Sequence, residues 1–188
     1  ANHQGGMGDW IRDELGVQKG FLAAELRPQG GEITSFVNTH THPRSEAGRV
    51  AQAIQLIHYF YFRAPHALYQ PLVLMGDFND YPQSLELELL EKLLLVRDAY
   101  KDFRGTYRGA CTYCAENPLT WSSDDEVLDY VFYRSGSIQG LEVTKAEINL
   151  KGTVGDPLSD HYGVRVRFRW VPVSLMSAES PVFKSRIA

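Results

Sequence analysis

Residues 71–80 read PLVLMGDFND, a short apolar run that ends abruptly in two aspartates and an asparagine. A continuous apolar run of this length is typical of a strand that is buried on both faces. The end of such a strand holds side chains rigidly, which is what a catalytic or binding site requires. We therefore expect Asp77 and Asn79 to lie at the edge of a buried sheet, and Asp80 to be either a turn residue or a ligand.

Other apolar runs also end in polar side chains or contain them. FVNTHTHP (36–43) ends in His40 and His42, LDYVFYR (128–134) contains Asp129, and PLSDHYGV (157–164) places Asp160 and His161 before an apolar segment. A single aspartate at a strand end is most often a turn former or a helix cap. Together, Asp, Asn and His can hold a divalent cation, orient a water molecule and transfer a proton.

The surrounding patterns mix strands and helices. The runs 20–27 and 32–40 flank the turn-forming PQGG and predict a hairpin. Further strands are expected at 71–77, 126–134, 141–150 and 163–170, the last with strict alternation of apolar residues and arginines. Helices are expected at 46–62 and 84–95. In the first helix the predicted buried stripe is Val50, Ile54, Ile57 and Tyr61. The mixture indicates a layered α/β or α+β domain.

Composition narrows the class of protein. Of 188 residues, 44% are apolar and 22% are charged, which is ordinary for a globular domain. The chain contains no apolar run long enough to cross a bilayer. The net charge of −4 argues against a broad surface that coats nucleic acid, because Lys and Arg drive phosphate binding. It leaves open a nuclease whose metal ion carries the local positive charge.

Two cysteines, Cys111 and Cys114, stand in the segment CTYC. A zinc site needs about four ligands, and neither a second CxxC nor an HxxxH pattern accompanies them. We expect two ordinary thiols near a loop in preference to a metal or redox site. Few cysteines are compatible with the cytoplasm. The compartment stays open, with a cytoplasmic or peripheral membrane location favoured.

The motifs GDFND, LDYVFYR and LSDHYGV, in this order after a strand that ends in TH, resemble the endonuclease/exonuclease/phosphatase superfamily. That superfamily includes deoxyribonuclease I, abasic-site endonucleases, inositol polyphosphate phosphatases and neutral sphingomyelinases. The resemblance implies an α/β fold, the four-layered sandwich of the deoxyribonuclease I type, with two central mixed or antiparallel sheets flanked by helices. It divides the chain into a partial catalytic domain at residues 1–170 and a C-terminal tail at 171–188.

Within the superfamily, three longer blocks resemble the neutral sphingomyelinases. They are the stretch from GDW (8–10) to THTHP (39–43), the helix AGRVAQAIQLIHYF (47–60), and GDFNDYPQSLELELLEKLLLVRDAY (76–100). Family members begin with an upstream half that supplies an Asn and a metal-binding Glu, and no equivalent precedes Gly8. We therefore expect this chain to supply only the C-terminal portion of the sandwich. The chain would then be a fragment, a processed product or one half of a two-chain assembly with the missing half as a separate segment, and without that half a large apolar face would be exposed.

The resemblance implies that an activated water hydrolyses a phosphodiester while Mg²⁺ holds the phosphate. His161 would be the general base, and Asp129 would hydrogen-bond its other ring nitrogen, which fixes the tautomer and raises the basicity. His40 would stabilise the transition state or protonate the leaving oxygen.

The same resemblance assigns roles around the metal ion and the phosphate. Asp77 would orient the attacking water or assist metal binding, Asn79 would lie at the metal and donate to a phosphate oxygen, and Asp160 is a candidate metal ligand. His42 would support the site from behind. Arg49 and Gln52 could reach a substrate from the start of their helix, although a solvated helix face is the simpler interpretation.

Three functions compete. A sphingomyelin phosphodiesterase would act on a phospholipid at a membrane surface and needs apolar residues near the cleft, for which HYFYFRAPHALY (58–69) is the candidate. A nuclease of the same superfamily would need a basic groove; Arg165, Arg167 and Arg169 form a row, but a solvent-facing strand explains them more simply. The third is a truncated module without activity. Trp121 would line the cleft or belong to the core.

Overall fold

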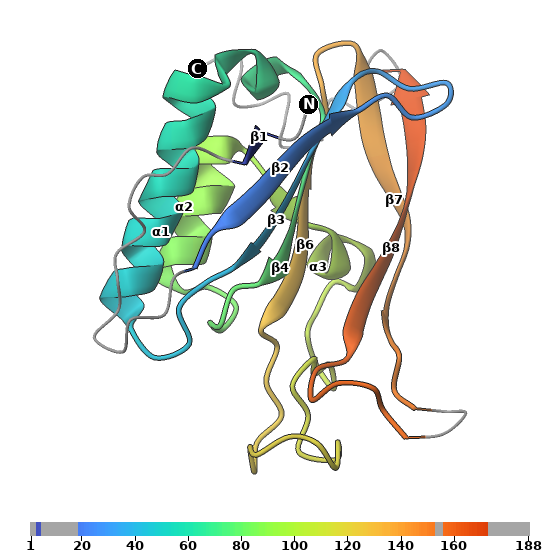
Figure 1. The fold of residues 1–188 in the computed structure, drawn as a ribbon. Helices are drawn as coiled ribbons and strands as arrows, with labels where there is room; N and C mark the ends of the chain where they lie inside the picture. The colour runs from blue at the N-terminus through green and yellow to red at the C-terminus, as the bar shows by residue number, and fades with distance from the viewer. Residues whose placement is uncertain (1–2, 5–18, 153–155, 173–188) are drawn as a thin grey trace.

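The computed structural model describes residues 3–4, 19–152 and 156–172, which form two sheets with a pair of helices on one side (Figure 1). In chain order the elements are β1 (His3–Gln4), β2 (Phe21–Leu26), β3 (Thr34–His40), α1 (Glu46–His58), the π-helix η1 (Tyr59–Arg63), the 3-10 helix η2 (Pro65–Tyr69), β4 (Leu72–Asp77), α2 (Leu85–Leu94), β5 (Arg97–Asp98), α3 (Ala99–Arg104), β6 (Asp129–Arg134), β7 (Gln139–Asn149) and β8 (Gly163–Pro172).

The larger sheet has the strand order β1-β2-β3-β4-β6-β5. Strands β2 and β3 form the predicted antiparallel hairpin, and the Gly31 N–H donates to the Pro28 carbonyl in the turn between them (3.1 Å). The pair β3–β4 is parallel, and β6 pairs antiparallel with both β4 and β5, so the sheet is mixed. The first three residues of β4 are buried, which confirms the interpretation of residues 71–77 as a strand covered on both faces.

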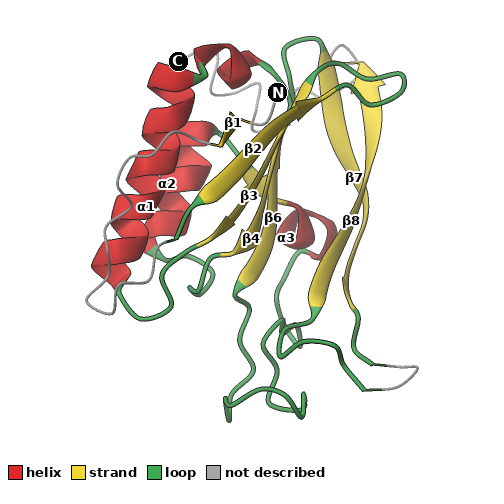
Figure 2. Cartoon of the chain, viewed as in Figure 1, coloured by secondary structure: helices red, strands yellow, loops and turns green. Residues whose placement is uncertain are grey.

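Helices α1 and α2 cover one face of the larger sheet (Figure 2). Both helices lie where the sequence predicts them, but of the predicted buried stripe only Ile57 is buried. Ile54 and Tyr61 are 53% and 46% exposed, whereas Ala53, Leu56, Ile57 and Phe60 are buried. The buried set follows the i, i+3, i+4, i+7 spacing of a helix face, displaced by one position from the predicted stripe.

Strands β7 and β8 form a separate two-stranded antiparallel sheet against the other face. The predicted alternation in β8 is confirmed: Val164, Val166, Phe168 and Trp170 pack toward the larger sheet. Arg165, Arg167 and Arg169 are exposed, and Arg169 pairs with Glu142 at 2.7 Å. The outer face of this sheet is therefore charged.

Two apolar cores lie on the two faces of the larger sheet, and they differ in how well they are covered. Toward the helices, Phe60, Leu74 and Leu90 are at most 1% exposed. Between the sheets, Val143, Val164 and Trp170 are only partly buried. The core between the two sheets is therefore less completely covered than the core under the helices, and the expected exposed apolar face stays a prediction.

The mixed sheet, its helices and the second sheet form the predicted layered α/β sandwich. The sequence patterns missed α3, because six residues are too few for a helical period to be recognised. Its N-cap is Asp98, whose carboxylate accepts the N–H groups of Tyr100 and Lys101. Strand β8 continues two residues past the boundary predicted at residue 170, and residues 173–188 lie outside the described part. Within the described residues, no helix combines the length and apolar character needed to span a membrane.

Candidate active site

Three strands bring polar side chains to one edge of the larger sheet. His40 ends β3, Asp77 ends β4 and Asp129 begins β6. The register places His40 opposite Asp77, and Asp77 opposite Asp129. The three residues therefore lie in a row across neighbouring strands, at the lower end of the sheet in Figure 1. The expectation that Asp77 lies at the edge of a buried sheet is confirmed.

Gly76 allows β4 to deliver Asp77 to this row. Its φ is +141°, and a Cβ added there would lie 1.9 Å from the Thr39 carbonyl oxygen. No other residue type fits this position without a shift of the neighbouring strand. Beyond the strand, the chain turns through Asn79, whose φ is +50°. The Asn79 N–H donates to Asp77 Oδ1 (2.8 Å) and its Nδ2 donates to the Thr41 carbonyl (3.0 Å), so this turn is held on both sides.

His161 joins the row from the loop before β8. Its Nδ1 lies 2.7 Å from Asp129 Oδ2, and its Nε2 lies 3.9 Å from Asp77 Oδ2. The same Asp77 oxygen lies 3.4 Å from His40 Nε2. The Asp77 carboxylate therefore lies between the imidazoles of His40 and His161. The Asp129 carboxylate contacts the other ring nitrogen of His161.

The electrostatics of the site follow from this placement. Burial raises the pKa of Asp77, and the neighbouring Asp129 raises it further. The hydrogen bond that the His161 ring makes to the Asp129 carboxylate raises the pKa of His161 above its ordinary value. Burial lowers the pKa of His40, and the Lys19 ammonium, 3.0 Å from His40 Nε2, acts in the same direction. The two histidines therefore differ, and His161 is the stronger base.

The site also contains residues that the sequence patterns did not select. Lys19 contacts His40, and the Tyr113 ring lies 4.9 Å from the His161 ring. Thr112, between the two cysteines, hydrogen-bonds the backbone at Asp129. No local pattern marks these three residues, since each becomes relevant only through residues distant in the chain.

Several other candidates lie outside the row. Arg49 Nε pairs with Asp80 (3.0 Å) and Glu86 (2.6 Å) in a nearly buried cluster, so Arg49 is not part of a solvated helix face. Gln52 is buried, and its Oε1 accepts the His42 N–H. The His42 ring accepts the N–H groups of Arg44 and Ser45 through Nδ1. Gln52 and His42 therefore hold the loop before α1, and a supporting role of His42 in the site stays a prediction.

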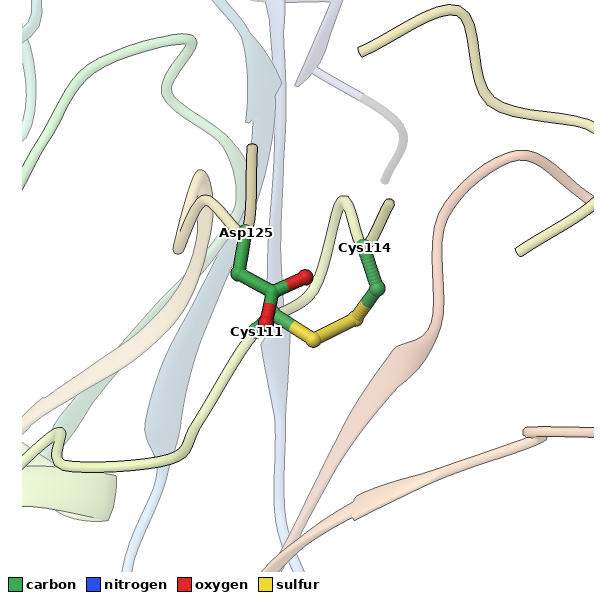
Figure 3. Close-up of side chains that lie close together, drawn as sticks. All are labelled: Cys111, Cys114 and Asp125. Carbon is green, nitrogen blue, oxygen red and sulfur yellow. A yellow bond between two sulfur atoms is a disulfide. The ribbon is translucent and has the colours of Figure 1, made fainter. Parts of the chain in front are cut away.

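Cys111 and Cys114 are joined in a disulfide, so the expectation of two ordinary thiols is wrong (Figure 3). Both cysteines are buried, and the Asp125 carboxylate lies next to the bond. Asp125 itself accepts the Ala115 N–H (3.1 Å). Residues three apart in a loop can bring their sulfur atoms together only if the loop folds back tightly. The spacing of the two cysteines in the sequence does not by itself show whether the loop folds back in this way.

The aromatic segment 58–69 does not lie near the site. It follows α1 and precedes β4, so it sits at the end of the sheet opposite Asp77 (Figure 1). The edge near the site instead carries Trp121, 95% exposed, and Leu158, 99% exposed. Trp121 is connected to the site because its N–H donates to the Tyr113 hydroxyl (3.1 Å). Trp121 is therefore not a core residue.

The donor set at this edge is suited to a hard divalent cation. Among the described residues, Asp77, Asp129 and His161 offer ligand atoms within 4.8 Å of one another. Two of the three are carboxylates, and Asp129 raises the pKa of Asp77. A cation between them would relieve this repulsion, and carboxylate oxygens are the ligands that Mg²⁺ prefers. Asp160 is not in this group; its Oδ1 accepts the Ser159 hydroxyl (3.2 Å), and its role as a ligand stays a prediction.

The fold is similar to that of several solved structures. The human Nocturnin catalytic domain with bound sulfate is 23% identical with a TM-score of 0.63; the match covers 83% of this chain and 54% of that one. TDP2 of D. rerio in complex with a single-strand DNA product is 16% identical with a TM-score of 0.62, covering 80% and 62%. The mannosyl-6-phosphatase Bt3783 of Bacteroides thetaiotaomicron is 18% identical with a TM-score of 0.54, covering 80% and 57%.

These likenesses show the fold, and the chain spans between half and two thirds of the length of each of these structures. No curated protein matches the chain in sequence. A family model does match, over residues 5–161, and it therefore includes every residue of the row described above. The chain belongs to the endonuclease/exonuclease/phosphatase family.

Proposed function

We propose that this chain carries the catalytic base of a metal-dependent phosphodiester hydrolase. The observation that supports this most strongly is the 2.7 Å contact between His161 Nδ1 and Asp129, with Nε2 on the opposite side of the ring at the polar edge. Asp129 holds the proton on Nδ1, which leaves Nε2 as the acceptor. A water placed at Nε2 loses a proton to His161 as it attacks the phosphorus.

The other residues of the row act on the charge of the phosphate. Asp77 Oδ2, near both imidazoles, orients the water and the cation. Asn79 has a second N–H on Nδ2 besides the one given to Thr41, and it donates this N–H to a phosphate oxygen. His40, with Lys19 beside it, stabilises the developing negative charge or protonates the leaving oxygen.

The cation proposed for this edge is Mg²⁺, held by Asp77 with Asn79 and Asp160 as further candidates. When bound, it neutralises charge on the phosphate as a Lewis acid. The oxygen-rich donor set supports Mg²⁺ over a softer metal ion.

The proposed substrate is sphingomyelin, cleaved to ceramide and phosphocholine. The sequence blocks at 8–43, 47–60 and 76–100 support this reading. The exposed Trp121 and Leu158 also support it, because an apolar surface beside the site is needed to engage a lipid bilayer. Their loops are joined by a hydrogen bond from Asn117 Nδ2 to the Ser159 carbonyl (3.0 Å), so they form one rim near His161.

The test is phosphocholine release from sphingomyelin vesicles in Mg²⁺ by the full-length protein that contains this chain. We expect release to be lost with a chelator and to fall about 10²–10⁴-fold in His161→Ala, the range for loss of a general base. Plasmid DNA is the parallel substrate. Nicked plasmid without phosphocholine release would show that the substrate is nucleic acid and not the proposed lipid. No activity on either substrate would favour a different phosphoester substrate or a module without activity.

The membrane rim has its own control. The double variant Trp121→Ser/Leu158→Ser should lower the rate on vesicles by about tenfold or more, because two apolar side chains no longer enter the bilayer. A soluble phosphodiester, bis(p-nitrophenyl) phosphate, should be hydrolysed at the unchanged rate. Phe62→Ser is the matched control, since Phe62 is 71% exposed at the opposite end of the sheet. An equal loss of the rate on vesicles in Phe62→Ser would contradict the proposal that the Trp121 and Leu158 rim engages the bilayer.

A further inference from the structure

We propose that Thr112 is a positioning residue that aligns the Asp129–His161 pair; this inference rests on the proposed function. The need for such a residue follows from the topology. Asp129 begins β6 in the six-stranded sheet, and His161 precedes β8 in the two-stranded sheet. No strand ladder among the described residues joins β6 to β8, so sheet pairing does not set the distance between the two side chains.

Thr112 contacts the chain next to both members of the pair. Its Oγ1 accepts the N–H of Leu128 (3.0 Å) and the N–H of Asp129 (3.1 Å). Its carbonyl accepts the N–H of Tyr162, the residue after His161 (2.7 Å). The side chain is completely buried, so water does not replace these bonds when they are lost. One residue therefore links the backbone of Asp129 to the backbone beside His161.

Thr112 is itself held firmly. The Cys111–Cys114 disulfide closes the loop on both sides of it, and its own N–H donates to the Glu126 carbonyl (2.8 Å). The next residue, Tyr113, forms a bridge with Glu126 and places its ring 4.9 Å from that of His161. The CTYC segment is thus held in place by a disulfide, by backbone hydrogen bonds and by a bridge to Glu126. Side chains held by such a support keep the geometry that catalysis needs.

Since Thr112 does not touch the site where the phosphate would lie, its loss should change the rate and leave substrate binding intact. Thr112→Val keeps the shape and removes the acceptor, whereas Thr112→Ser keeps the acceptor. Thr34→Val is the matched control, because Thr34 is also completely buried, donates to the Glu32 carbonyl, and begins β3 at the end opposite His40.

We expect Thr112→Val in the full-length protein to lower kcat on sphingomyelin vesicles about 10–100-fold with KM unchanged, because misplacement by about 1 Å has effects of that order. Thr112→Ser should stay within about threefold of the wild type, and Thr34→Val should keep kcat. A second readout needs no turnover: the NMR resonance of the His161 Nδ1–H, shifted downfield by its carboxylate partner, should weaken or move in Thr112→Val and persist in the other two variants.

A Thr112→Val variant with wild-type kcat and an unchanged resonance would overturn the proposal. So would an equal loss of kcat in Thr34→Val, which would mean that any buried threonine has this effect. If the wild type hydrolyses no phosphodiester, the proposed function fails. The resonance in the three variants then decides, by itself, whether Thr112 aligns the pair.

Discussion

Two clusters of ionisable side chains, both anchored in GDFND, show how the same residue types take different roles. The first, the histidine cluster, consists of Asp77, Asp129 and His161, and its side chains are 17–24% exposed. The second, the arginine cluster, consists of Arg49, Asp80 and Glu86, and its side chains are only 3–11% exposed. Asp77 and Asp80 are three residues apart in the chain, and they belong to different clusters.

The clusters differ in how their charges are balanced. In the arginine cluster the Arg49 guanidinium contacts both carboxyl groups. Hydrogen bonds with Glu86, Tyr81 and Arg49 hold the pKa of Asp80 below its ordinary value, although burial acts in the opposite direction. Burial raises the pKa of Glu86. In the histidine cluster two carboxylates face one another and no Lys or Arg pairs with either among the described contacts. A balanced, buried cluster is structural, whereas an unbalanced one at an accessible edge is suited to a cation and to proton transfer.

The largest expected effect is on the arginine cluster. Arg49→Met leaves two carboxyl groups buried without their cation, and we expect the free energy of unfolding to fall by about 3–5 kcal/mol. The folded fraction should keep its kcat. Urea denaturation measures the first quantity, and kcat per folded molecule the second. Arg165→Met is the control; Arg165 is 62% exposed and 3.7 Å from Glu147, and its loss should cost at most about 1 kcal/mol. If both variants lost the same free energy of unfolding, buried and exposed ion pairs in this protein would contribute equally to stability, contrary to our prediction.

The second expected effect is on the histidine cluster. Asp77→Asn should lower kcat about 10²–10³-fold, the usual cost of one group aimed at the transition state. Its stability should change little, because the substitution also removes the repulsion between Asp77 and Asp129. Asp80→Asn is the matched control and should do the reverse, with lower stability and the kcat of the wild type. If Asp80→Asn lost activity and Asp77→Asn lost stability, our assignment of the two clusters would be wrong.

The smallest effect concerns a third buried carboxyl, Asp98. It has backbone N–H partners, and no ion pair with a described Lys or Arg is seen. Burial raises its pKa from 3.8 to about 7 in the folded chain. Between these values the unfolded chain has lost the proton and the folded chain retains it, so stability falls as the pH rises. Relative to Asp98→Asn, we expect the wild type to lose about 2 kcal/mol between about pH 5 and about pH 6.5.

The measurement for Asp98 is urea denaturation of both proteins across this pH range. Asparagine keeps the side-chain oxygen that caps α3 and does not titrate, so the difference between the two curves isolates the carboxyl group. A difference that is constant with pH would show that Asp98 ionises normally in the folded protein. A wild type that gains stability as the pH rises would show that the backbone N–H groups outweigh the burial.

Much of the fold could be predicted because it rests on local periodicity. Alternation identified β8, a continuous apolar run identified β4, and the PQGG turn identified the β2–β3 hairpin. The buried face of α1 could not be predicted to within one residue. Apolar residues such as Ile54 also occur on the exposed face, and only packing against the sheet decides which face is buried. Helix α3 is defined by its Asp98 cap more than by any period.

The candidate site divides in the same way. His40, Asp77 and Asn79 were recognisable because each follows an apolar run, and Asp129 because it interrupts one. The disulfide, the Arg49 pairings and the contact of Thr112 with Asp129 were not, because each joins segments whose relative placement no local pattern records. The aromatic segment 58–69 was expected near the cleft for the same reason: composition indicates an exposed apolar surface but not the end of the sheet at which it lies.

The amino-acid sequence by itself determined the family, the longer strands and helices, and the set of polar residues delivered to strand ends. Periodicity and motif order suffice for these, because they depend on residues close together in the chain. Only the tertiary structure decided which aspartate of GDFND faces His161 and which faces Arg49. That choice depends on strand register, on a loop held by a disulfide and on burial, and these arise only when distant segments pack together.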